Sequence, residues 1–457
     1  MSPRQHHWFG AVVASLVVAS PASAHGIGGR GDLPIPKSYY IWAASLAVGV
    51  SFLAASVLWA KPWAARLGAG KPAPSWTDII QRVFAPVTRA LGLVVLATVL
   101  IAGWSGPSDP TSNIAPVALY VVLWVLLLWA SALIGPLWQA VNPWDTLAGL
   151  LTGPIGPTPP AEPAGRSLPY SHWPAAVGLF AFVWLELAYY NPSSPRVVAM
   201  GLTVYTVLVL AAVVRWGRRW VQTGEAFTVL FGLVALISPV GRRDDGRLTW
   251  RLPFAGLATL APRRGTVAVV LTVLGGTTFD GVTRTPWWGE RIRLATGWER
   301  TGINTLGLLG VIGLVALAYL AATWCAAALA RSARHESPQR YVHTLVPIAL
   351  AYSVAHYFSL AVFEGQTAWR LMSDPFGRGW DVFGTANHQI DYLALSTGLI
   401  ALVVTMSMIV GHVVGVVLAH DRAAEQVGGS RAVISQLPMA AVMIGLTVTG
   451  LTLLLSV

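Results

Sequence analysis

The chain alternates between long apolar runs and short polar segments. A helix needs about 17–25 predominantly apolar residues to cross the hydrocarbon core of a bilayer. Runs of that order predict ten membrane-spanning helices, at residues 39–60, 83–103, 116–135, 173–190, 197–214, 265–282, 303–330, 341–363, 393–418 and 433–457. The predicted fold class is therefore all-α, a polytopic transmembrane helix bundle.

An eleventh apolar run, residues 225–240, is short and ends at Ser238-Pro239, just before Arg242-Arg243. If this run does not cross, the segments on its side of the membrane carry 20 Lys and Arg residues against 9 on the other side. If it crosses, the division becomes 15 against 14. Because basic loops stay in the cytoplasm, the first topology is favoured. We expect a re-entrant or interfacial helix there on the cytoplasmic side, with eleven true spans as the alternative.

The composition agrees with a membrane protein. Of the 457 residues, 55% are hydrophobic and only 11% are charged, whereas a soluble domain averages about 25% charged residues. This excludes an ordinary water-soluble enzyme and a disordered chain, and the chain has no basic tail that would bind nucleic acid. The single cysteine, Cys325, excludes an intramolecular disulfide framework and a thiolate metal cluster.

Residues 1–24 have the pattern of a cleaved signal peptide. Arg4 supplies a positive charge, residues 8–19 form a short apolar stretch, and Ala22-Ser23-Ala24 is a small-residue cleavage site. An uncleaved anchor is the alternative. Cleavage leaves His25 as the mature N-terminus, on the extracytoplasmic side, with an α-amine and an imidazole that together could chelate a metal ion.

A segment rich in proline and glycine, residues 153–172, divides the mature chain. It predicts a linker between a first bundle of three spans, residues 25–152, and a main transmembrane bundle, residues 173–457.

Ionisable side chains at membrane depth are costly and by default mark function. In the ten-span topology the outer ends of the spans, with one outer loop, collect Glu186, Asp280, His356, Glu364, His388 and Asp391. Imidazole suits Zn and Cu, and carboxylates also bind divalent ions. We therefore expect one extracytoplasmic site with a divalent metal, Zn or Cu, and the alternative is a set of separate, solvated interfacial residues.

The roles follow from the chemistry of a metal-bound water. The expected metal ligands are His25, Asp280, His356 and His388. Glu364 or Asp391 could take the proton of the water that the metal activates, so these are the expected catalytic residues.

A second pair of histidines, His412 and His420, is predicted nearer the inner face. A haem or metal role is one interpretation. The other is that His412 forms a hydrogen bond between helices, because Gly411 and Gly415 beside it allow close approach of a neighbouring backbone.

Several strings in the sequence look familiar together. They are His25-Gly26-Ile27-Gly28-Gly29-Arg30-Gly31-Asp32-Leu33-Pro34, Leu137-Trp138-Gln139-Ala140-Val141-Asn142-Pro143-Trp144, Ser238-Pro239-Val240-Gly241-Arg242, Phe279-Asp280-Gly281 with Thr285-Pro286-Trp287-Trp288, Asp374-Pro375-Phe376-Gly377-Arg378-Gly379-Trp380-Asp381, and Gly411-His412 with Ala419-His420-Asp421-Arg422-Ala423. Over essentially the whole mature chain, the sequence resembles the fenitrothion hydrolase family of bacterial integral membrane proteins.

The resemblance implies a function but carries over no catalytic residue. It implies hydrolysis of organophosphorus triesters at the P–O bond to an aryl leaving group, a second membrane subunit as partner, and a multi-pass location in the bacterial inner membrane. Such a small hydrophobic substrate is neutral, so it can reach a site between helices from the lipid bilayer.

Two other classes of function remain open. One is a membrane transporter or a copper-handling protein, in which polar residues would continue through the membrane, with His356 and His412 as two stations. The other is a non-catalytic scaffold subunit whose partner carries the chemistry.

Overall fold

The computed structural model describes residues 35–58, 62, 64–153, 170–243, 246–427 and 429–455. It is 77% helical, and the described part contains nine helices that are long and apolar enough to cross a membrane. The all-α bundle is thus confirmed. The nine are α2 (Lys37–Leu58), α4 (Trp76–Ser105), the continuous α5 (Ile114–Val117), η2 (Ala118–Leu127) and α6 (Leu128–Ile134), α10 (Pro195–Trp216), α13 (Thr266–Thr283), α15 (Gly297–Ala330), α16 (Ser337–Tyr341) with η6 (Val342–Thr344) and α17 (Leu345–Ser373), α18 (Thr397–Gln426) and α19 (Gly429–Leu454).

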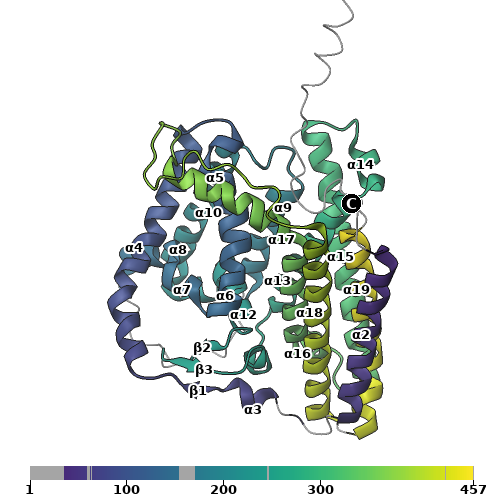
Figure 1. Ribbon diagram of the computed structural model, residues 1–457. Coiled ribbons are helices and arrows are strands. Elements are labelled where there is room, and N and C mark those ends of the chain that lie inside the picture. The colour runs from purple at the N-terminus through teal and green to yellow at the C-terminus, as the bar shows by residue number, and fades with distance from the viewer. Residues whose placement is uncertain are drawn as a thin grey trace, which may run out of the picture.

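The predicted span over residues 173–190 is not among these nine. It forms the shorter helix α9 (Trp173–Leu187), which has 15 residues. In Figure 1, α2 begins and α19 ends in the upper half of the molecule, and we call the upper end of the molecule the upper face. The opposite end, the lower face, carries α3 (Ala64–Gly68) and a small sheet. Both described ends on one face are what an even number of crossings produces.

The apolar run near residue 225 does not cross the bundle. It forms α12 (Ala226–Ala235), a buried helix of 10 residues, which is about 15 Å long and covers half of a hydrocarbon core of about 30 Å. After it, β2 (Val240–Arg242) and β3 (Leu248–Trp250) form a hairpin, and β1 (Lys71–Pro72) pairs with the other edge of β3. The sheet lies at the lower face (Figure 1).

Contacts at the lower face show where the chain enters and leaves this segment. Arg218, just after α10, bonds to Asp145 of α8 (Pro143–Thr152), with 2.6 Å between Nη2 and Oδ2. The backbone N–H of His172, before α9, donates to the carbonyl of Arg264, before α13. The beginning of α8 therefore lies beside the end of α10, and the beginnings of α9 and α13 lie together. The Tyr170 hydroxyl, just before α9, donates to the carbonyl of Trp216 at the end of α10 at 3.0 Å, so α10 ends on the face where α9 and α13 begin, as a re-entrant segment requires.

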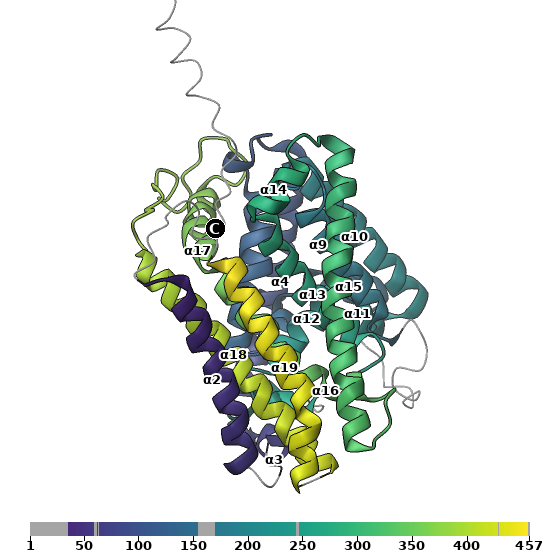
Figure 2. The same ribbon diagram turned by 90° about the vertical axis from the view of Figure 1, so that its right-hand side faces the viewer.

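The first three spans do not form a separate bundle, so the expected grouping of residues 25–152 is wrong. Figures 1 and 2 show α2 beside α18 and α19. Its buried side chains Ala44, Val48, Phe52 and Ala55 form one stripe along the helix. The helix α4 packs instead against α10, α8 and α7 (Leu137–Val141). Helices in a membrane associate through close packing of small residues, whatever their order in the chain.

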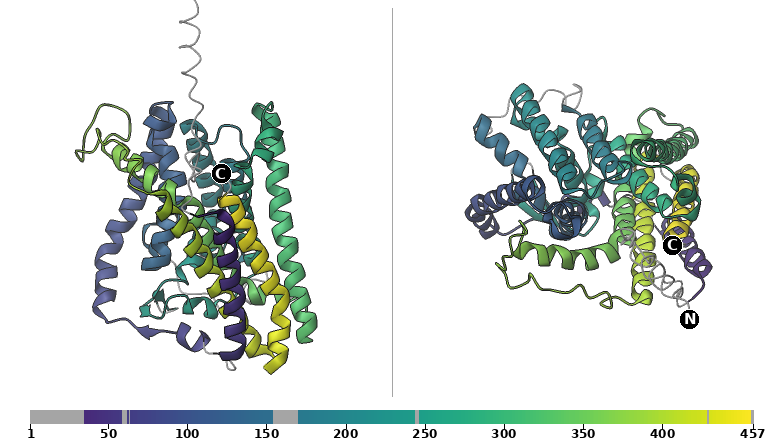
Figure 3. Two further views of the ribbon diagram at one scale, coloured as in Figure 1. Left: turned by 45° about the vertical axis from the view of Figure 1, so that its right-hand side comes forward. Right: turned by 90° about the horizontal axis from the view of Figure 1, so that it is seen from above.

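The upper half of α17 reaches across the molecule. Seen from above in Figure 3, it extends from the C-terminal helices toward the helices of the first third of the chain. Its Arg370 guanidinium donates to the carbonyl of Thr111, which lies between α4 and α5, at 2.9 Å. The connection of residues 374–396 then returns along the upper face to α18.

Candidate functional site

Two residues from different helices form a buried pair in the upper half of the bundle. Asp280 lies near the upper end of α13 and His356 near the middle of α17. His356 Nε2 is 2.7 Å from Asp280 Oδ2, and the two residues are 2% and 7% exposed. The helix α13 is held in the centre by Gly275 and Gly276, because a Cβ on either would press into Ile312 or Val183.

Two further side chains bind the same carboxylate. The Tyr357 hydroxyl donates to Asp280 Oδ2 at 3.1 Å. Arg284, one turn after Asp280, places Nη2 at 3.2 Å from Oδ1 and 3.3 Å from Oδ2. The Arg284 guanidinium thus neutralises a carboxylate that would otherwise be costly at this depth.

A second carboxylate lies beside this group. Glu186 of α9 interacts electrostatically with both Asp280 and Arg284. Asp280 and Arg284 form a neutral pair, so the net charge of the group depends on the protons carried by Glu186 and His356.

The second ring nitrogen of His356, Nδ1, can give the pair an acid–base function. Nδ1 is buried and has no hydrogen-bond partner among the described residues. If Nε2–H donates to Asp280, the lone pair of Nδ1 is available to accept a proton. A carboxylate that orients one imidazole nitrogen and leaves the other free is the arrangement of a general base.

A line of polar groups continues from the pair toward the lower face. The ring of Tyr352, one turn before His356, lies edge-on to the imidazole, with 6.2 Å between ring centroids. Tyr352, Thr278, Thr449 and His412 line a small cavity of about 10 Å³, near the smallest volume that holds one water molecule. The polar line therefore reaches His412.

His412 lies near the middle of α18, deeper in the bundle than its expected place near the inner face. Its Nδ1 is 2.8 Å from the Met408 carbonyl, and Nε2 has no hydrogen-bond partner in the described ranges. Met408 belongs to α18 as well, so this hydrogen bond does not join two helices. The close approach of a neighbouring helix that was expected at the two glycines is present. A Cβ on Gly411 would lie 2.3 Å from the Ala351 Cβ, and a Cβ on Gly415 would lie 3.0 Å from the Thr344 carbonyl.

Two expected site residues lie apart, in the connection before α18. His388 and Asp391 are exposed, and both contact Gln366 of α17. The Asp391 N–H donates to Gln366 Oε1 at 2.9 Å, and His388 Nε2 is 3.3 Å from the same oxygen. The helix of the span predicted over residues 393–418 begins after both residues, because α18 begins at Thr397 with Ser396 as its cap.

The expected four-ligand metal site does not form from the described residues. No group of three or more His, Cys, Asp and Glu side chains among them could hold a metal ion. Asp280 and His356 bind each other, and Arg284 takes the second carboxylate oxygen. Glu364 is half-buried on α17, about two turns above His356. The remaining expected ligand, His25, lies outside the described residues.

Sequence reasoning missed three residues of interest. Arg284 follows Asp280 by four positions, the spacing of an intrahelical ion pair, and Tyr357 is adjacent to His356. The third is Glu225, a lone carboxylate at the start of an apolar run, which is fully buried.

Glu225 joins two short helices at their N-termini. It caps α12, accepting from the backbone N–H of Phe227 at 2.9 Å and of Thr228 at 2.7 Å. The Tyr205 hydroxyl also donates to it. Asn142, which caps α8, places Nδ2 at 3.4 Å from Glu225 Oε2 and 2.9 Å from the Thr228 hydroxyl. These donors satisfy the carboxylate, so we assign Glu225 to holding the re-entrant helix.

No protein-family model, curated protein or solved structure matches the chain. The fold defines an all-α helical bundle whose apolar helices are compatible with a multi-pass membrane protein.

Proposed function

We propose that this chain is the integral membrane subunit of a hydrolase for organophosphorus triesters, with Asp280 and His356 as its acid–base centre. The observation that carries the proposal is the His356 imidazole, oriented by Asp280 through Nε2 and without a described partner at Nδ1. The substrate class and the second membrane subunit rest on the sequence resemblance.

The chemistry uses groups that the chain supplies. His356 Nδ1 accepts a proton from water as the water oxygen forms a bond to phosphorus. The P–O bond to the aryl group breaks, and the aryl oxygen leaves as a phenolate, which later takes up a proton. Asp280 stabilises the imidazolium that forms, and Arg284 keeps Asp280 ionised beside it. The proposed step uses no metal, because Arg284 and His356 already bind the Asp280 carboxylate.

The charge distribution supports an orientation. The basic hairpin and the loops around it lie at the lower face, so the positive-inside rule places that face in the cytoplasm. The Asp280–His356 pair then lies in the extracytoplasmic half of a bacterial inner membrane, and a neutral triester reaches it from the outer leaflet.

The test is hydrolysis of a nitrophenyl phosphotriester by the purified protein in proteoliposomes, followed by nitrophenolate absorbance. General-base catalysis contributes about 10²–10⁴-fold, so His356→Gln and Asp280→Asn should lose about that factor in rate. The control is His388→Gln, a histidine on the same face but outside the group. A His356→Gln protein that is folded and hydrolyses at the rate of the unchanged protein refutes the assignment.

One observation favours a second candidate, transfer of protons through the bundle. Tyr352 packs on His356, and a water molecule in the cavity that Tyr352, Thr278 and His412 line would join these groups into a proton path. If it conducts, His412→Gln should slow the decay of a pH gradient across proteoliposomes. Hydrolysis should be insensitive to that change, because His412 lies beyond Tyr352 from the Asp280–His356 pair, so one set of variants separates the two functions.

A further inference from the structure

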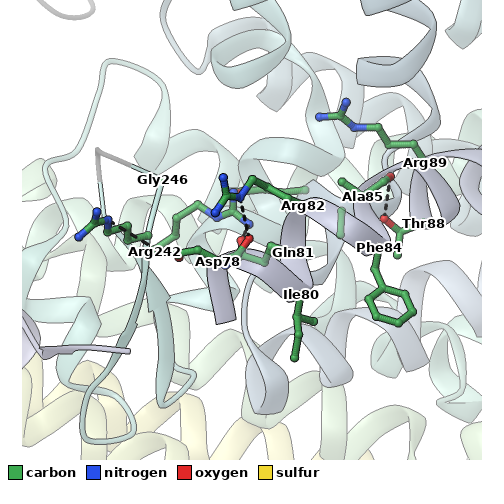
Figure 4. Close-up of a pocket in the computed structure, with 13 residues that line it drawn as sticks. Asp78, Ile80, Gln81, Arg82, Phe84, Ala85, Thr88, Arg89, Arg242 and Gly246 are labelled. Atoms are coloured by element: carbon green, nitrogen blue, oxygen red, sulfur yellow. Dashed lines mark hydrogen bonds and ion pairs between the residues drawn. The ribbon is translucent and has the colours of Figure 1, made fainter. Parts of the chain in front are cut away.

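A cavity of about 630 Å³ lies at the lower face between α4, α7 and the β2–β3 hairpin. Its charged lining residues are Asp78, Arg82, Arg89, Arg242 and Arg247. Figure 4 shows Arg82 and Asp78 of α4 close to Arg242 of the hairpin, while Arg89 lies farther along the helix. Ile80 and Phe84 add apolar surface from the same helix.

Positive charge exceeds negative charge around this cavity, with four guanidinium groups against the single carboxylate of Asp78. The Asp78 carboxylate is 3.8 Å from Arg247 Nε. Arg242 Nη2 donates to the neutral Gln81 at 2.7 Å, and Arg82 Nε donates to the backbone carbonyl of Asp78 at 3.2 Å. Partial burial lowers the pKa of Arg242, so an anion there meets a guanidinium that water only partly surrounds.

The level of the cavity relative to the membrane follows from the length and sequence of α4. The helix has 30 residues, or about 45 Å, which exceeds a hydrocarbon core of about 30 Å. Its charged residues, Asp78, Arg82 and Arg89, all lie in its lower half. Above them the helix is uncharged and exposes apolar side chains such as Leu91 and Val94. The cavity thus lies at the level of lipid headgroups, beside a helix face that suits acyl chains.

We propose that this cavity binds the phosphate headgroup of an anionic phospholipid, with its acyl chains along the exposed apolar side of α4. Guanidinium groups bind phosphate oxygens in pairs and suit this role better than ammonium groups do. Basic pockets at the cytoplasmic level of membrane helices bind anionic headgroups for the same reason. The site is separate from the Asp280–His356 group and does not depend on the proposed hydrolysis.

The test is native mass spectrometry of the full-length protein, stripped of lipid in detergent and titrated with phosphatidylglycerol or phosphatidylcholine. A basic residue near an anionic surface contributes about fivefold to binding. The double variant Arg82→Gln/Arg242→Gln should therefore bind phosphatidylglycerol about 25-fold more weakly. The matched control is Arg334→Gln/Arg431→Gln, which removes two exposed charges from the same face outside the cavity.

The unchanged protein and the control should both hold phosphatidylglycerol in preference to phosphatidylcholine. If the double variant does not fold, as judged by gel filtration, Arg89→Gln alone should weaken binding about fivefold. The proposal is wrong if the unchanged protein does not discriminate between the lipids, or if the cavity and control variants lose affinity equally. A third arm adds inorganic phosphate, and displacement of the lipid at equal concentration would make free phosphate the ligand and overturn the lipid assignment.

Discussion

Replacing Asp280 with asparagine tests the electrostatics of the buried group. The substitution keeps the size of the side chain but leaves the Arg284 guanidinium, whose side chain is 11% exposed, without its nearest carboxylate. Removing one partner of a buried ion pair costs about 3–5 kcal/mol of unfolding free energy. Glu186 also attracts Arg284, so we expect the lower end, about 3 kcal/mol.

The double variant Asp280→Asn/Arg284→Gln separates this charge effect from packing. Without the guanidinium there is no uncompensated cation, so the double variant should recover most of the lost stability. The measurement is the free energy of unfolding from denaturant titrations in mixed micelles. Glu290→Gln serves as control, because its 3.4 Å pair with Arg293 is exposed and such pairs contribute about 0–1 kcal/mol.

Two results would refute the reasoning. One is an Asp280→Asn cost no larger than that of Glu290→Gln. The other is a double variant as unstable as the single one, which would show that Asp280 and Arg284 are not energetically coupled.

Three further outcomes are expected. Glu225→Ala should lower the unfolding free energy by about 2 kcal/mol or more, measured in the same titration, because it removes a helix cap and leaves the buried partners unsatisfied; Glu425→Ala, partly exposed on α18, should change it far less. Treatment with EDTA should leave nitrophenyl phosphotriester hydrolysis unchanged, and a loss of rate that added Zn restores would instead support the metal site with His25. Burial, aided by the positive charge of Arg263, lowers the pKa of His172 to about 4 in the folded protein, whereas an unfolded histidine has a pKa of about 6.5. Between about pH 6.5 and about pH 4 the unfolded chain therefore binds more protons than the folded protein does. Stability should thus fall as the pH drops through this window, by up to about 3 kcal/mol, and His172→Gln should flatten the pH dependence of unfolding.

The sequence predicted those features of the fold that depend on local length and summed charge. The short helix α12 is the clearest example, because a run of that length cannot span and its basic neighbours favour one side. The neighbours of α2 could not be predicted, since interhelical contacts depend on how the small residues of two surfaces fit. Proline and glycine in the linker mark a break in the chain and say nothing about which helices meet.

Part of the candidate site could be predicted from the depth of its residues in the membrane. Once the direction of each span is set, residues at similar distances from the same face are candidates for contact, and Asp280 and His356 do meet. His388 and Asp391 lie apart from this pair, in the connection before α18, because the Ser396 hydroxyl caps a helix that begins only at Thr397. Glu364 shares a helix with His356, but the two are separated by about two turns.

Arg284 determines which chemical role Asp280 can take. In the sequence it is one basic residue at the end of an apolar run, which suits a side chain that reaches the membrane surface. In the structure it turns back by one helical turn to Asp280, and this changes what Asp280 can do. A carboxylate free of cations attracts a metal ion, whereas one already held by a guanidinium orients a neighbouring imidazole. The same two residues, Asp280 and His356, therefore change from expected metal ligands to a proposed proton-transfer pair, and a third side chain decides between the roles.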